Sequence, residues 1–355
     1  MPALSIIIPT YNRLARLKVV LAALERQTYP RDDFEVLVVS DGSPDGTDDY
    51  LRNAVIPDGS SSPLHLTPLF QPNGGVATAR NNGLAHATGD LVVFIDDDVV
   101  AAPELLSEHV AAHGRAGPDA VVLGPLLIPT DFHLSPWTLW EQKMLNKQYG
   151  DMLAGNWAPT ARQFYTGNAS ISRQCLVNAG GFNTSFRRAE DVELGYRLAD
   201  AGMHFVYAPH ARAFHYVERS FRSWLDIPYA YGRNDVIFTH DRGQTWLLPT
   251  ILHEYHSRKA LIRLLVRACM GHARLSQVVT TLLNKAALLG ASAGIQAIPR
   301  AAYSGIFNLR HYQGIADEMG GRAQFFTEVE RARVTPYKTP EILKPRSVHM
   351  EQPHE

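Results

Sequence analysis

Three consecutive aspartates, Asp96, Asp97 and Asp98, follow a short apolar run of the sequence. In an extended chain, residues two apart point the same way, so Asp96 and Asp98 would share one target. Two carboxylates this close repel each other unless a cation lies between them, and hard oxygen ligands favour Mg²⁺ or Mn²⁺. A metal there would also stabilise a departing diphosphate. A solvated acidic turn is the alternative, and the three residues alone leave both interpretations open.

Two other polar stretches stand at comparable places. Pro9 to Arg13 and Ser40 to Ser43 each follow an apolar run typical of a buried strand. Because ligands bind at the carboxyl ends of the strands in an open α/β sheet, we expect these stretches and the aspartates to converge in space. Asp41 has a second interpretation, since Asp-Gly is a strong turn dipeptide and Gly42 follows it.

A fourth acidic feature, Glu190-Asp191, opens a predicted helix over residues 190–201. The positive end of the helix dipole favours ionised carboxylates at this place. Such a carboxylate can act as a general base that takes the proton of an attacking hydroxyl. Simple capping is the alternative, because acidic residues are enriched at helix starts.

The elements that must position these residues alternate between strand and helix. In the first hundred residues the pattern predicts strands at 5–8, 34–39, 64–70 and 91–95, with helices at 13–27, 44–54 and 76–87. Repeated units of this length predict a parallel, doubly wound α/β sheet. The next hundred residues predict strands at 120–128, 169–172 and 204–207 and helices at 137–148 and 190–201, and the chain from about 255 is predicted to be helical.

The composition is that of a folded globular protein: of 355 residues, 45% are hydrophobic and 19% are charged. The formal net charge of −1 gives no indication of nucleic-acid binding. Cys175 and Cys269 have no metal-ligand spacing and do not form a disulfide scaffold, which fits a reducing compartment. No signal peptide and no transmembrane helix are expected, so the predicted location is the cytoplasm.

Five segments together carry a resemblance to one known family. They are Ile6 to Arg13, Val38 to Ser43, Gly74 to Gly83, Phe94 to Asp98 and Ala189 to Leu198. In order and spacing they are similar to the inverting glycosyltransferase family 2, which has the GT-A fold, over residues 3 to 220. Each segment is a modest signal, whereas the whole set is specific. The resemblance implies a Rossmann-like, mostly parallel sheet with a helical C-terminal region.

On the donor side, the resemblance implies that Tyr11 stacks on a nucleobase, usually uracil, and that Thr10 lines the same pocket. Asp41 would accept a hydrogen bond from the base, Arg80 would lie near the base or the phosphates, and Asp96 would meet the ribose. A strand-end aromatic with no ligand is the alternative for Tyr11. The donor-side residues implied in this way are Pro9, Thr10, Tyr11, Arg13, Asp41, Arg80, Asp96 and Asp97.

On the metal and acceptor side, the resemblance implies that Asp98 holds Mn²⁺ or Mg²⁺, with Asp96 and His215 as further ligands. A histidine beside aromatics is also often a satisfied core residue, so that reading of His215 stays open. Asp191 would be the general base, and the substrate-side Glu190 is the second choice for that role. Arg219 would meet the diphosphate. Trp137, Trp140 and Trp157 are either an acceptor surface or core packing.

These expectations define a domain layout. Residues 1–220 would form the GT-A catalytic domain, with nucleotide-sugar binding in about 1–100 and the acceptor side in about 101–220. Residues 221–335 would be helical and basic, and 336–355 a disordered tail. The predicted function is metal-dependent, inverting transfer of a sugar from a nucleotide-sugar to a hydroxyl. The donor is expected to be a UDP-sugar, with GDP- and dTDP-sugars open, and the acceptor a cell-surface glycan, a lipid-linked molecule or another hydroxyl compound.

Other enzyme classes fit the sequence less well. A Rossmann dehydrogenase needs a GxGxxG turn after the first strand, and a nucleotidyltransferase needs a Gly-rich basic loop there; the sequence has Pro9-Thr10-Tyr11-Asn12 instead. A non-catalytic nucleotide-sugar-binding protein of the same fold is the main alternative. It would keep Tyr11 and Asp41 but would not need Asp191.

Charge placement separately predicts contact with an anionic membrane surface. Residues 255–316 contain no Asp or Glu. If the segment forms one helix, its basic side chains lie on one face and its apolar side chains on the other, which is typical of a helix that lies on anionic lipid at the inner face of the membrane. A helix packed on the catalytic domain and an acidic partner protein are the alternatives. The basic face is Lys259, Arg263, Arg267 and Arg274, and the apolar face is Leu261, Leu264, Leu265 and Ala268.

Overall fold

A computed structural model describes residues 3–54 and 64–335, and it divides the chain into two compact units. The first unit comprises residues 3–132 and 148–216 within the described part of the chain. The second comprises residues 133–147 and 217–335.

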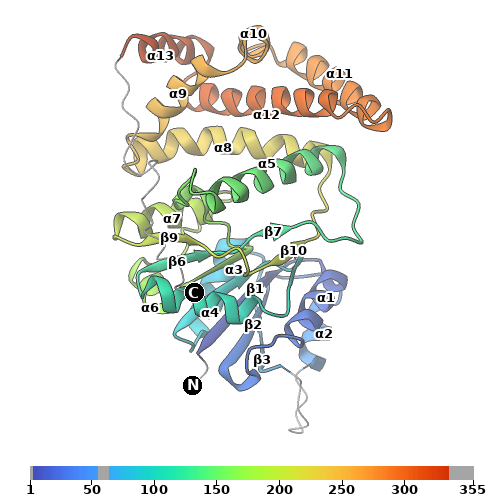
Figure 1. The fold of residues 1–355 in the computed structure, drawn as a ribbon, viewed down its shortest axis with the longest axis vertical. Helices are drawn as coiled ribbons and strands as arrows, with labels where there is room; N and C mark the ends of the chain where they lie inside the picture. Colours follow the sequence, from blue (N-terminus) through green and yellow to red (C-terminus); the bar gives the residue numbers. More distant parts are fainter. Residues whose placement is uncertain (1–2, 55–63, 336–355) are drawn as a thin grey trace, which may run out of the picture. The chain divides into compact units, whose positions relative to one another are not determined.

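A seven-stranded sheet with the order β3-β2-β1-β4-β8-β6-β9 forms the centre of the first unit (Figure 1). Strand β8 pairs antiparallel with β4 and β6, and the other neighbours are parallel. The predicted mostly parallel α/β sheet is therefore confirmed. The strands are β1 Leu4–Thr10, β2 Phe34–Ser40, β3 Leu66–Phe70, β4 Leu91–Ile95, β6 Ala120–Leu123, β8 Asn168–Ser172 and β9 His204–Tyr207.

Two apolar layers cover the two faces of this sheet. Ile6 and Ile8 of β1 belong to one buried cluster with side chains of α1, while Ile7 belongs to the other with Leu84 of α3 and Leu194 of α7. Alternate side chains of a strand point to opposite faces, so continuous apolar runs are required where both faces are covered. The helices of this unit are α1 Leu14–Leu24, α2 Thr47–Ala54, α3 Val76–His86, α4 Leu105–Ala116, α6 Arg173–Asn178 and α7 Glu190–Asp200, with 3₁₀ turns at Arg31–Asp33 and Ala161–Gln163.

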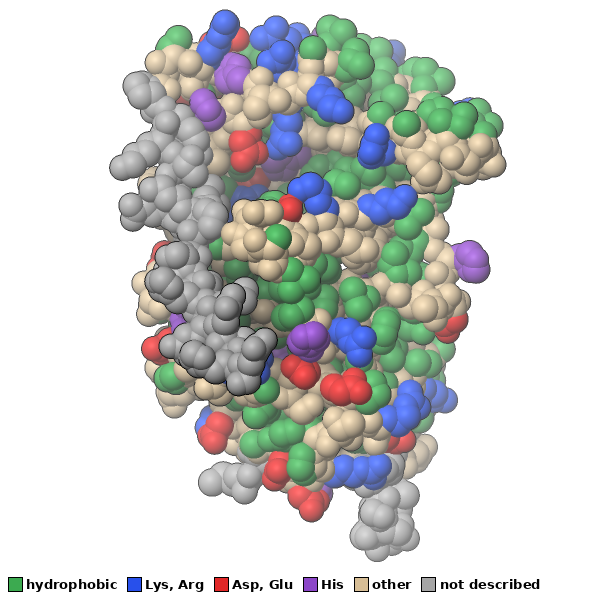
Figure 2. Space-filling view, in the orientation of Figure 1, with side chains coloured by type: hydrophobic (Ala, Val, Ile, Leu, Met, Phe, Trp, Pro, Cys, Tyr) green, Lys and Arg blue, Asp and Glu red, His purple; other side chains and the backbone are tan. Residues whose placement is uncertain are grey.

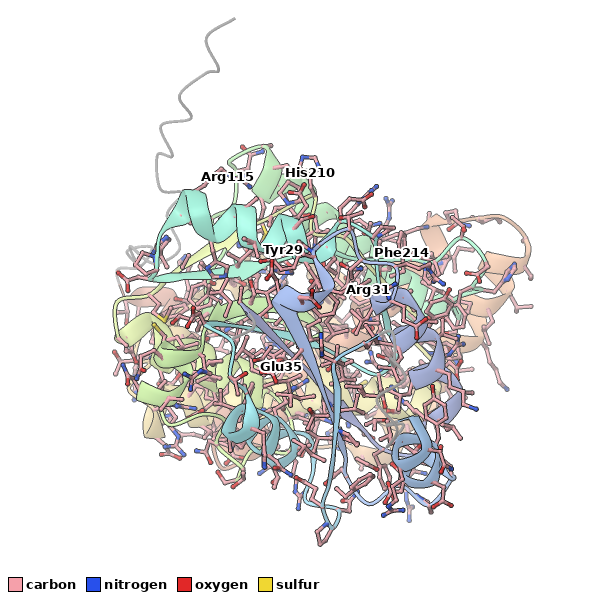
Figure 3. All side chains as sticks on the ribbon, turned by 90° about the horizontal axis from the view of Figure 1, so that it is seen from below. Tyr29, Arg31, Glu35, Arg115, His210 and Phe214 are labelled. Carbon is pink, nitrogen blue, oxygen red and sulfur yellow. The ribbon has the colours of Figure 1, made fainter. Side chains whose placement is uncertain are left out.

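Glu35 ties together the amino-terminal ends of the central strands. It lies at the start of β2 and is labelled in Figure 3. Its Oε1 accepts hydrogen bonds from Ser5 Oγ at 2.6 Å, Thr88 N at 2.7 Å and Thr88 Oγ1 at 2.8 Å. Burial opposes ionisation, but these bonds lower the pKa of Glu35 below its usual value. This end of the sheet is thus fixed by internal bonds, and the opposite end carries the polar segments singled out in the sequence.

A small second sheet lies beside the end of β4. Its strands are β5 Val99–Ala101, β7 Leu126–Leu127 and β10 Ala213–His215, in the order β5-β10-β7. His215 pairs with Val99, so the residue after β10 and the residue before β5 are adjacent: Tyr216 N donates to Asp98 O at 2.9 Å. This pairing was not predicted, and it brings His215 next to the aspartates.

The second unit is helical, and its long helices α8 and α12 pack closely. A Cβ on Gly232 would lie 2.0 Å from His311 O, and a Cβ on Gly314 would lie 2.0 Å from Tyr229 O. Glycine at both places lets the two backbones approach to contact. The helices are α8 Phe221–Asp241, α9 Leu247–Ser257, α10 Ala260–Cys269, α11 Ala273–Ser292, α12 Ala297–Glu318 and α13 Arg322–Val334; α5 Pro136–Leu153 begins in this unit and ends in the first (Figure 1).

Two sequence predictions need correction, and one alternative that the sequence left open is decided. The strand predicted at 120–128 is two strands, β6 and β7, because Gly124 and Pro125 interrupt it. The single basic helix predicted to carry Lys259 to Arg274 is two helices, since α10 ends at Cys269 and Gly271 has a φ of 77°. Trp137 and Trp140 pack in the core of the helical unit with Trp224, which favours core packing over an acceptor surface. Trp157 belongs to the first unit and is exposed.

Within residues 3–54 and 64–335, no helix is both long enough and apolar enough to cross a membrane. The tail predicted to be disordered, 336–355, lies outside the described residues.

Candidate functional site

The carboxyl ends of β1, β2 and β4 meet at one edge of the sheet. Thr10 at the end of β1 donates from Oγ1 to Asp97 Oδ2 at 2.9 Å, and Asp41 N after β2 donates to Thr10 O at 2.9 Å. Pro9 and Thr10 are paired in register with Val39 and Ser40. The convergence expected from parallel strands is therefore present.

The three aspartates form a turn between β4 and β5 instead of an extended segment. Val99 N donates to Asp96 O at 3.0 Å, which closes a four-residue turn. In a turn, residues two apart no longer point the same way, so the argument from extended-chain periodicity is wrong here. Asp96 pairs with Arg80, whereas Asp98 pairs with Arg13 and lies near His215. Asp96 and Asp98 therefore have different partners.

Arg13 holds the middle and last aspartates in place. Its Nη1 lies 3.0 Å from Asp97 Oδ1 and 2.5 Å from Asp98 Oδ2. Burial, opposed by the charge of Arg13, raises the pKa of Asp97 to about 6. Burial also acts against ionisation of Asp98, but the hydrogen bond and charge of His215, together with the charge of Arg13, lower its pKa below the usual value. Asp98 therefore stays ionised.

Asp98 and His215 are the residues of this edge that could hold a divalent cation. Nε2 of His215 lies 3.4 Å from Asp98 Oδ1. No cluster of three or more His, Cys, Asp or Glu side chains arranged for a metal occurs in the described part of the chain, so the predicted trio of Asp96, Asp98 and His215 is not assembled. Mg²⁺ and Mn²⁺ are often held by one or two protein ligands together with substrate phosphates, and a carboxylate with an imidazole fits that arrangement.

Arg80 joins the aspartate turn to the start of α7. The side chain is 3% exposed, and it donates from Nη2 to Asp96 Oδ1 and from Nη1 to Glu190 Oε1, each at 2.8 Å. Its guanidinium also lies 5.4 Å from the ring of Phe182. Both terminal nitrogens are thus engaged by carboxylates inside the protein, and the expected position of Arg80 near the base or the phosphates stays a prediction. Arg80 acts here as the brace between the two acidic segments.

Asp191 differs from its neighbour Glu190, because one carboxylate oxygen of Asp191 has no hydrogen-bond partner among the described residues. Its Oδ1 accepts from Val192 N at 2.8 Å, while Glu190 is paired with Arg80. Burial raises the pKa of Asp191 to about 7, aided by the negative charge of Glu190 and opposed by Arg80. A carboxylate with a pKa near neutrality can exchange a proton readily under ordinary conditions.

The residue before this helix start adopts a strained backbone conformation. Ala189 has a φ of 59°, in the left-handed region that residues with a Cβ rarely adopt. Asn12, beside Tyr11, is the other non-glycine residue in this region among those described, with a φ of 55°. Such strain persists where the surrounding structure fixes it, and it often accompanies functional sites. No sequence pattern indicates the strain at Ala189.

Asp41 organises the loop that leads into α3. Its Oδ1 accepts from Gln71 Nε2 at 2.8 Å and from Gly74 N at 2.7 Å, and its Oδ2 accepts from Gly75 N at 2.8 Å. Gly75 has a φ of 89°, which the turn into the helix requires. A carboxylate has about four acceptor positions, so Asp41 can take one further hydrogen bond. Its main contribution in this structure is to fix the loop.

Tyr11 presents an exposed ring at the same edge. It is 49% exposed, in contrast to Thr10 at 2%. An exposed aromatic next to buried polar groups can serve as a stacking surface for a planar ligand.

Comparison with known proteins agrees with this geometry. The family model described as glycosyl transferase family 2 matches residues 5–178. Glycosyltransferase AglE of Haloferax volcanii is 34% identical over 253 residues, which cover 71% of this chain and 76% of AglE. The chain belongs to glycosyltransferase family 2.

Other relatives match a smaller share of their own length. The validoxylamine A glucosyltransferase of Streptomyces hygroscopicus subsp. jinggangensis is 33% identical over 244 residues, 59% of this chain and 56% of that protein. This family 2 chain thus spans little more than half of that relative.

Solved structures show the same GT-A fold. The mannosyltransferase PcManGT from Pyrobaculum calidifontis, in complex with GDP-Man and Mn²⁺, has a TM-score of 0.57 at 22% identity, covering 88% of this chain and 87% of that one. S. aureus TarS 1–349 in complex with UDP-GlcNAc has a TM-score of 0.55 at 18% identity, covering 90% and 93%. At these identities the likeness concerns the fold alone.

One residue expected in the family 2 site belongs to the helical unit. Arg219 Nη1 lies 2.9 Å from Glu141 Oε2, and its carbonyl oxygen accepts from Trp137 Nε1 at 3.1 Å. These bonds engage Arg219 within its own unit. The predicted contact with a diphosphate therefore stays a prediction.

Proposed function

We propose that this family 2 chain is a glycosyltransferase that moves a sugar from a nucleotide-sugar to an acceptor hydroxyl with inversion at the anomeric carbon. The observation that carries the proposal is the bridge from Asp96 through Arg80 to Glu190. It fixes the start of α7, and with it Asp191, relative to the strand ends. A donor held at the strand ends and a base on α7 are what a single in-line displacement needs.

Asp191 is proposed as the general base. Its pKa of about 7 lets it take the hydroxyl proton as the acceptor oxygen attacks the anomeric carbon and the bond to the diphosphate breaks. Glu190 is the second choice, because its Oε1 is already engaged by the hydrogen bond from Arg80.

The donor is proposed to bind over Tyr11 and Thr10, with Pro9, Arg13, Asp41 and Asp97 shaping the pocket. Asp96 would meet the ribose, and Arg219 the diphosphate. UDP-sugars are the proposed donors, supported by the UDP-GlcNAc bound to TarS, while the GDP-Man bound to PcManGT keeps GDP-sugars as the alternative. The proposed domain roles are donor binding in about 1–100, acceptor binding in about 101–220 and a separate basic helical region in 221–335.

A divalent cation is proposed as the cofactor, and Asp98 and His215 would hold it. Their separation of 3.4 Å supports this, as does the Mn²⁺ in the PcManGT complex. When bound, the ion supplies positive charge against the negative charge that develops on the leaving diphosphate. Arg13, which contacts Asp98, keeps that carboxylate oriented.

Donor hydrolysis tests the proposal against a protein that only binds nucleotide-sugars. Purified protein with Mn²⁺ and UDP-GlcNAc or UDP-Glc should release UDP slowly, because water can replace the acceptor. Asp191→Asn should lower the release by about 10²–10⁴-fold while leaving UDP affinity within a few-fold, since the amide cannot take a proton. UDP or GDP binding without any hydrolysis or transfer, across UDP- and GDP-sugars, would favour the non-catalytic alternative.

The acceptor and the cellular place are separate parts of the proposal. A glycan, a lipid-linked molecule or another hydroxyl compound is the proposed acceptor, and the cytoplasm or the inner face of the membrane is the proposed location. The membrane part depends on residues 255–316 and not on the sheet edge.

A further inference from the structure

Helices α10 and α11 carry a row of large apolar side chains that face solvent. Four positions on α11 are separated by three, four and seven residues, steps that return to the same face of a helix. Figure 2 shows hydrophobic side chains gathered with Lys and Arg side chains over this part of the helical unit. The exposed fractions are 79% for Leu261, 63% for Leu264, 44% for Leu275, 55% for Val278, 59% for Leu282 and 71% for Leu289.

The turn after α11 extends this apolar surface. Ile295 is 51% exposed and Ile298 is 38% exposed. Ala291 at the end of α11, Gln296 of the turn and Ala297 at the start of α12 line a cavity of about 280 Å³, whose wall also includes the basic Arg300. Clustered exposure of this kind is unlike the scattered single residues that are normal on protein surfaces, and it indicates a binding surface.

The charges within residues 255–316, the segment that carries the row, all have one sign. No Asp or Glu occurs from Tyr255 to Ala316. Arg274 and Lys285 lie on α11 along one edge of the row, because Lys285 is seven residues from Val278. Neither has an acidic partner within 3–54 and 64–335. By contrast, Arg263 is turned inward, with Nη1 donating to His256 O at 2.6 Å.

This arrangement corrects the basic face expected from the sequence. Arg263 points toward α9, whereas Arg267 lies 3.4 Å from Glu330 of α13 and is still 57% exposed; the apolar side of α10 also faces solvent. Arg274 and Lys285, which flank the apolar row, are exposed basic groups available to a partner. An apolar row with flanking cations matches the chemistry of a lipid surface: the row enters the acyl boundary, and the cations meet anionic headgroups.

We propose that the surface formed by Leu261, Leu264, Leu275, Val278, Leu282 and Leu289, flanked by Arg274 and Lys285, docks on an anionic lipid bilayer. A second copy of the chain fits less well, because symmetric pairing of this face would bring like charges together. The proposal is independent of the catalytic one, since it uses none of the residues at the sheet edge.

Vesicle flotation tests the proposal with the full chain. The protein should float with vesicles of phosphatidylglycerol and phosphatidylcholine at low salt, and much less with phosphatidylcholine alone or at high salt. Val278→Asp with Leu282→Asp should abolish flotation. Arg274→Glu with Lys285→Glu should weaken it by on the order of 30-fold or more, from about a tenfold factor per 1.4 kcal/mol and roughly 1 kcal/mol for each basic group lost.

Matched controls lie in the first unit. Leu153→Asp with Val177→Asp changes two exposed apolar residues, and Arg26→Glu with Arg115→Glu changes two exposed arginines, the second labelled in Figure 3. Both controls should float like the wild type. No flotation at low salt, or equal flotation of the α11 variants with an unchanged melting temperature, would overturn the proposal. A concentration-dependent dimer that is disrupted by Val278→Asp with Leu282→Asp would also overturn the proposal, because the apolar row would then bind a second copy of the chain.

Discussion

Asp191 and Glu190 are adjacent carboxylates with different surroundings. Glu190 is bound to the buried guanidinium of Arg80, whereas Asp191 keeps one oxygen without a described partner. Burial raises the pKa of Asp191. The negative charge of Glu190 adds to this effect, and the positive charge of Arg80 opposes it. Of the two neighbouring acids, Glu190 is thus held in place by Arg80, and Asp191 is the group ready to exchange a proton.

The first prediction at this scale concerns pH. Since the base acts when ionised and the pKa of Asp191 is about 7, kcat/KM should rise with pH through 7 and be about tenfold lower at pH 6 than on its plateau. Initial rates from pH 5.5 to 8.5 measure this.

Asp97, with a pKa of about 6, touches Thr10, so its ionisation should affect KM for the donor more than kcat.

A stability measurement separates this role from simple loss of fold. The pKa of Asp191 is higher in the folded protein than in the unfolded chain, so the folded protein binds more protons between about pH 4 and 7 and the group's contribution to stability falls as pH rises through that window. Asp191→Asn should therefore melt at least as high as wild type at pH 8 while losing turnover. A pH-independent wild-type rate between 6 and 8 would contradict the assignment.

At the scale of elements, the two faces of the sheet were predictable and the turns were not. Residues 6–8 of β1, 36–39 of β2 and 91–95 of β4 are apolar without interruption because both faces of the sheet are covered, and this pattern is strong in the sequence. The turn of Asp96 to Asp98 depends on Arg13, Arg80 and His215, which come from distant parts of the chain. Local periodicity therefore identified the right acids but assigned them a wrong geometry. Helix α4, Leu105–Ala116, was not predicted.

The brace formed by Arg80 was also beyond the reach of sequence patterns. Arg80 pairs with Asp96, 16 positions away, and with Glu190, 110 positions away. The family resemblance drew attention to Arg80 and Glu190 separately, yet nothing in their spacing indicates an ion pair. Asp41 is similar, because its bonds to Gly74 and Gly75 depend on how β3 and α3 are joined.

The second prediction concerns the crossing of α8 and α12. Gly314→Ala should destabilise the protein by about 1–3 kcal/mol, because the added Cβ would lie 2.0 Å from Tyr229 O and the helices would have to move apart. Gly114→Ala is the matched control: it lies in α4 with nothing within 4 Å of the added Cβ, so it should stabilise by about 0.5–1 kcal/mol. Urea unfolding followed by circular dichroism measures both. Equal effects of the two substitutions would show that the crossing tolerates a methyl group.

At the scale of the whole molecule, the strand-end residues proposed to bind the donor and the exposed apolar row belong to different units. The strand ends, the aspartate turn and the start of α7 all lie in the first unit, and α10 and α11 lie in the second. Ligand binding and surface docking can therefore be changed independently by mutation. Nucleotide binding measured on the intact chain can therefore be assigned to the first unit if substitutions in α11 leave it unchanged.

The third prediction uses ligand-linked stability of the intact chain. A ligand that binds only the folded protein stabilises it by mass action, by about 2.7 kcal/mol at 100 times its Kd. UDP with Mn²⁺ should raise the melting temperature by more than UDP alone, because Asp98 and His215 would hold the ion against the diphosphate, and EDTA should reverse the difference. Asp98→Asn should remove the increment due to Mn²⁺ while keeping that due to UDP, and Val278→Asp with Leu282→Asp should keep both. Absence of any shift with UDP, GDP or dTDP, with or without Mn²⁺, would contradict a nucleotide-sugar site at this edge of the sheet. An unchanged increment in Asp98→Asn would place the ion elsewhere.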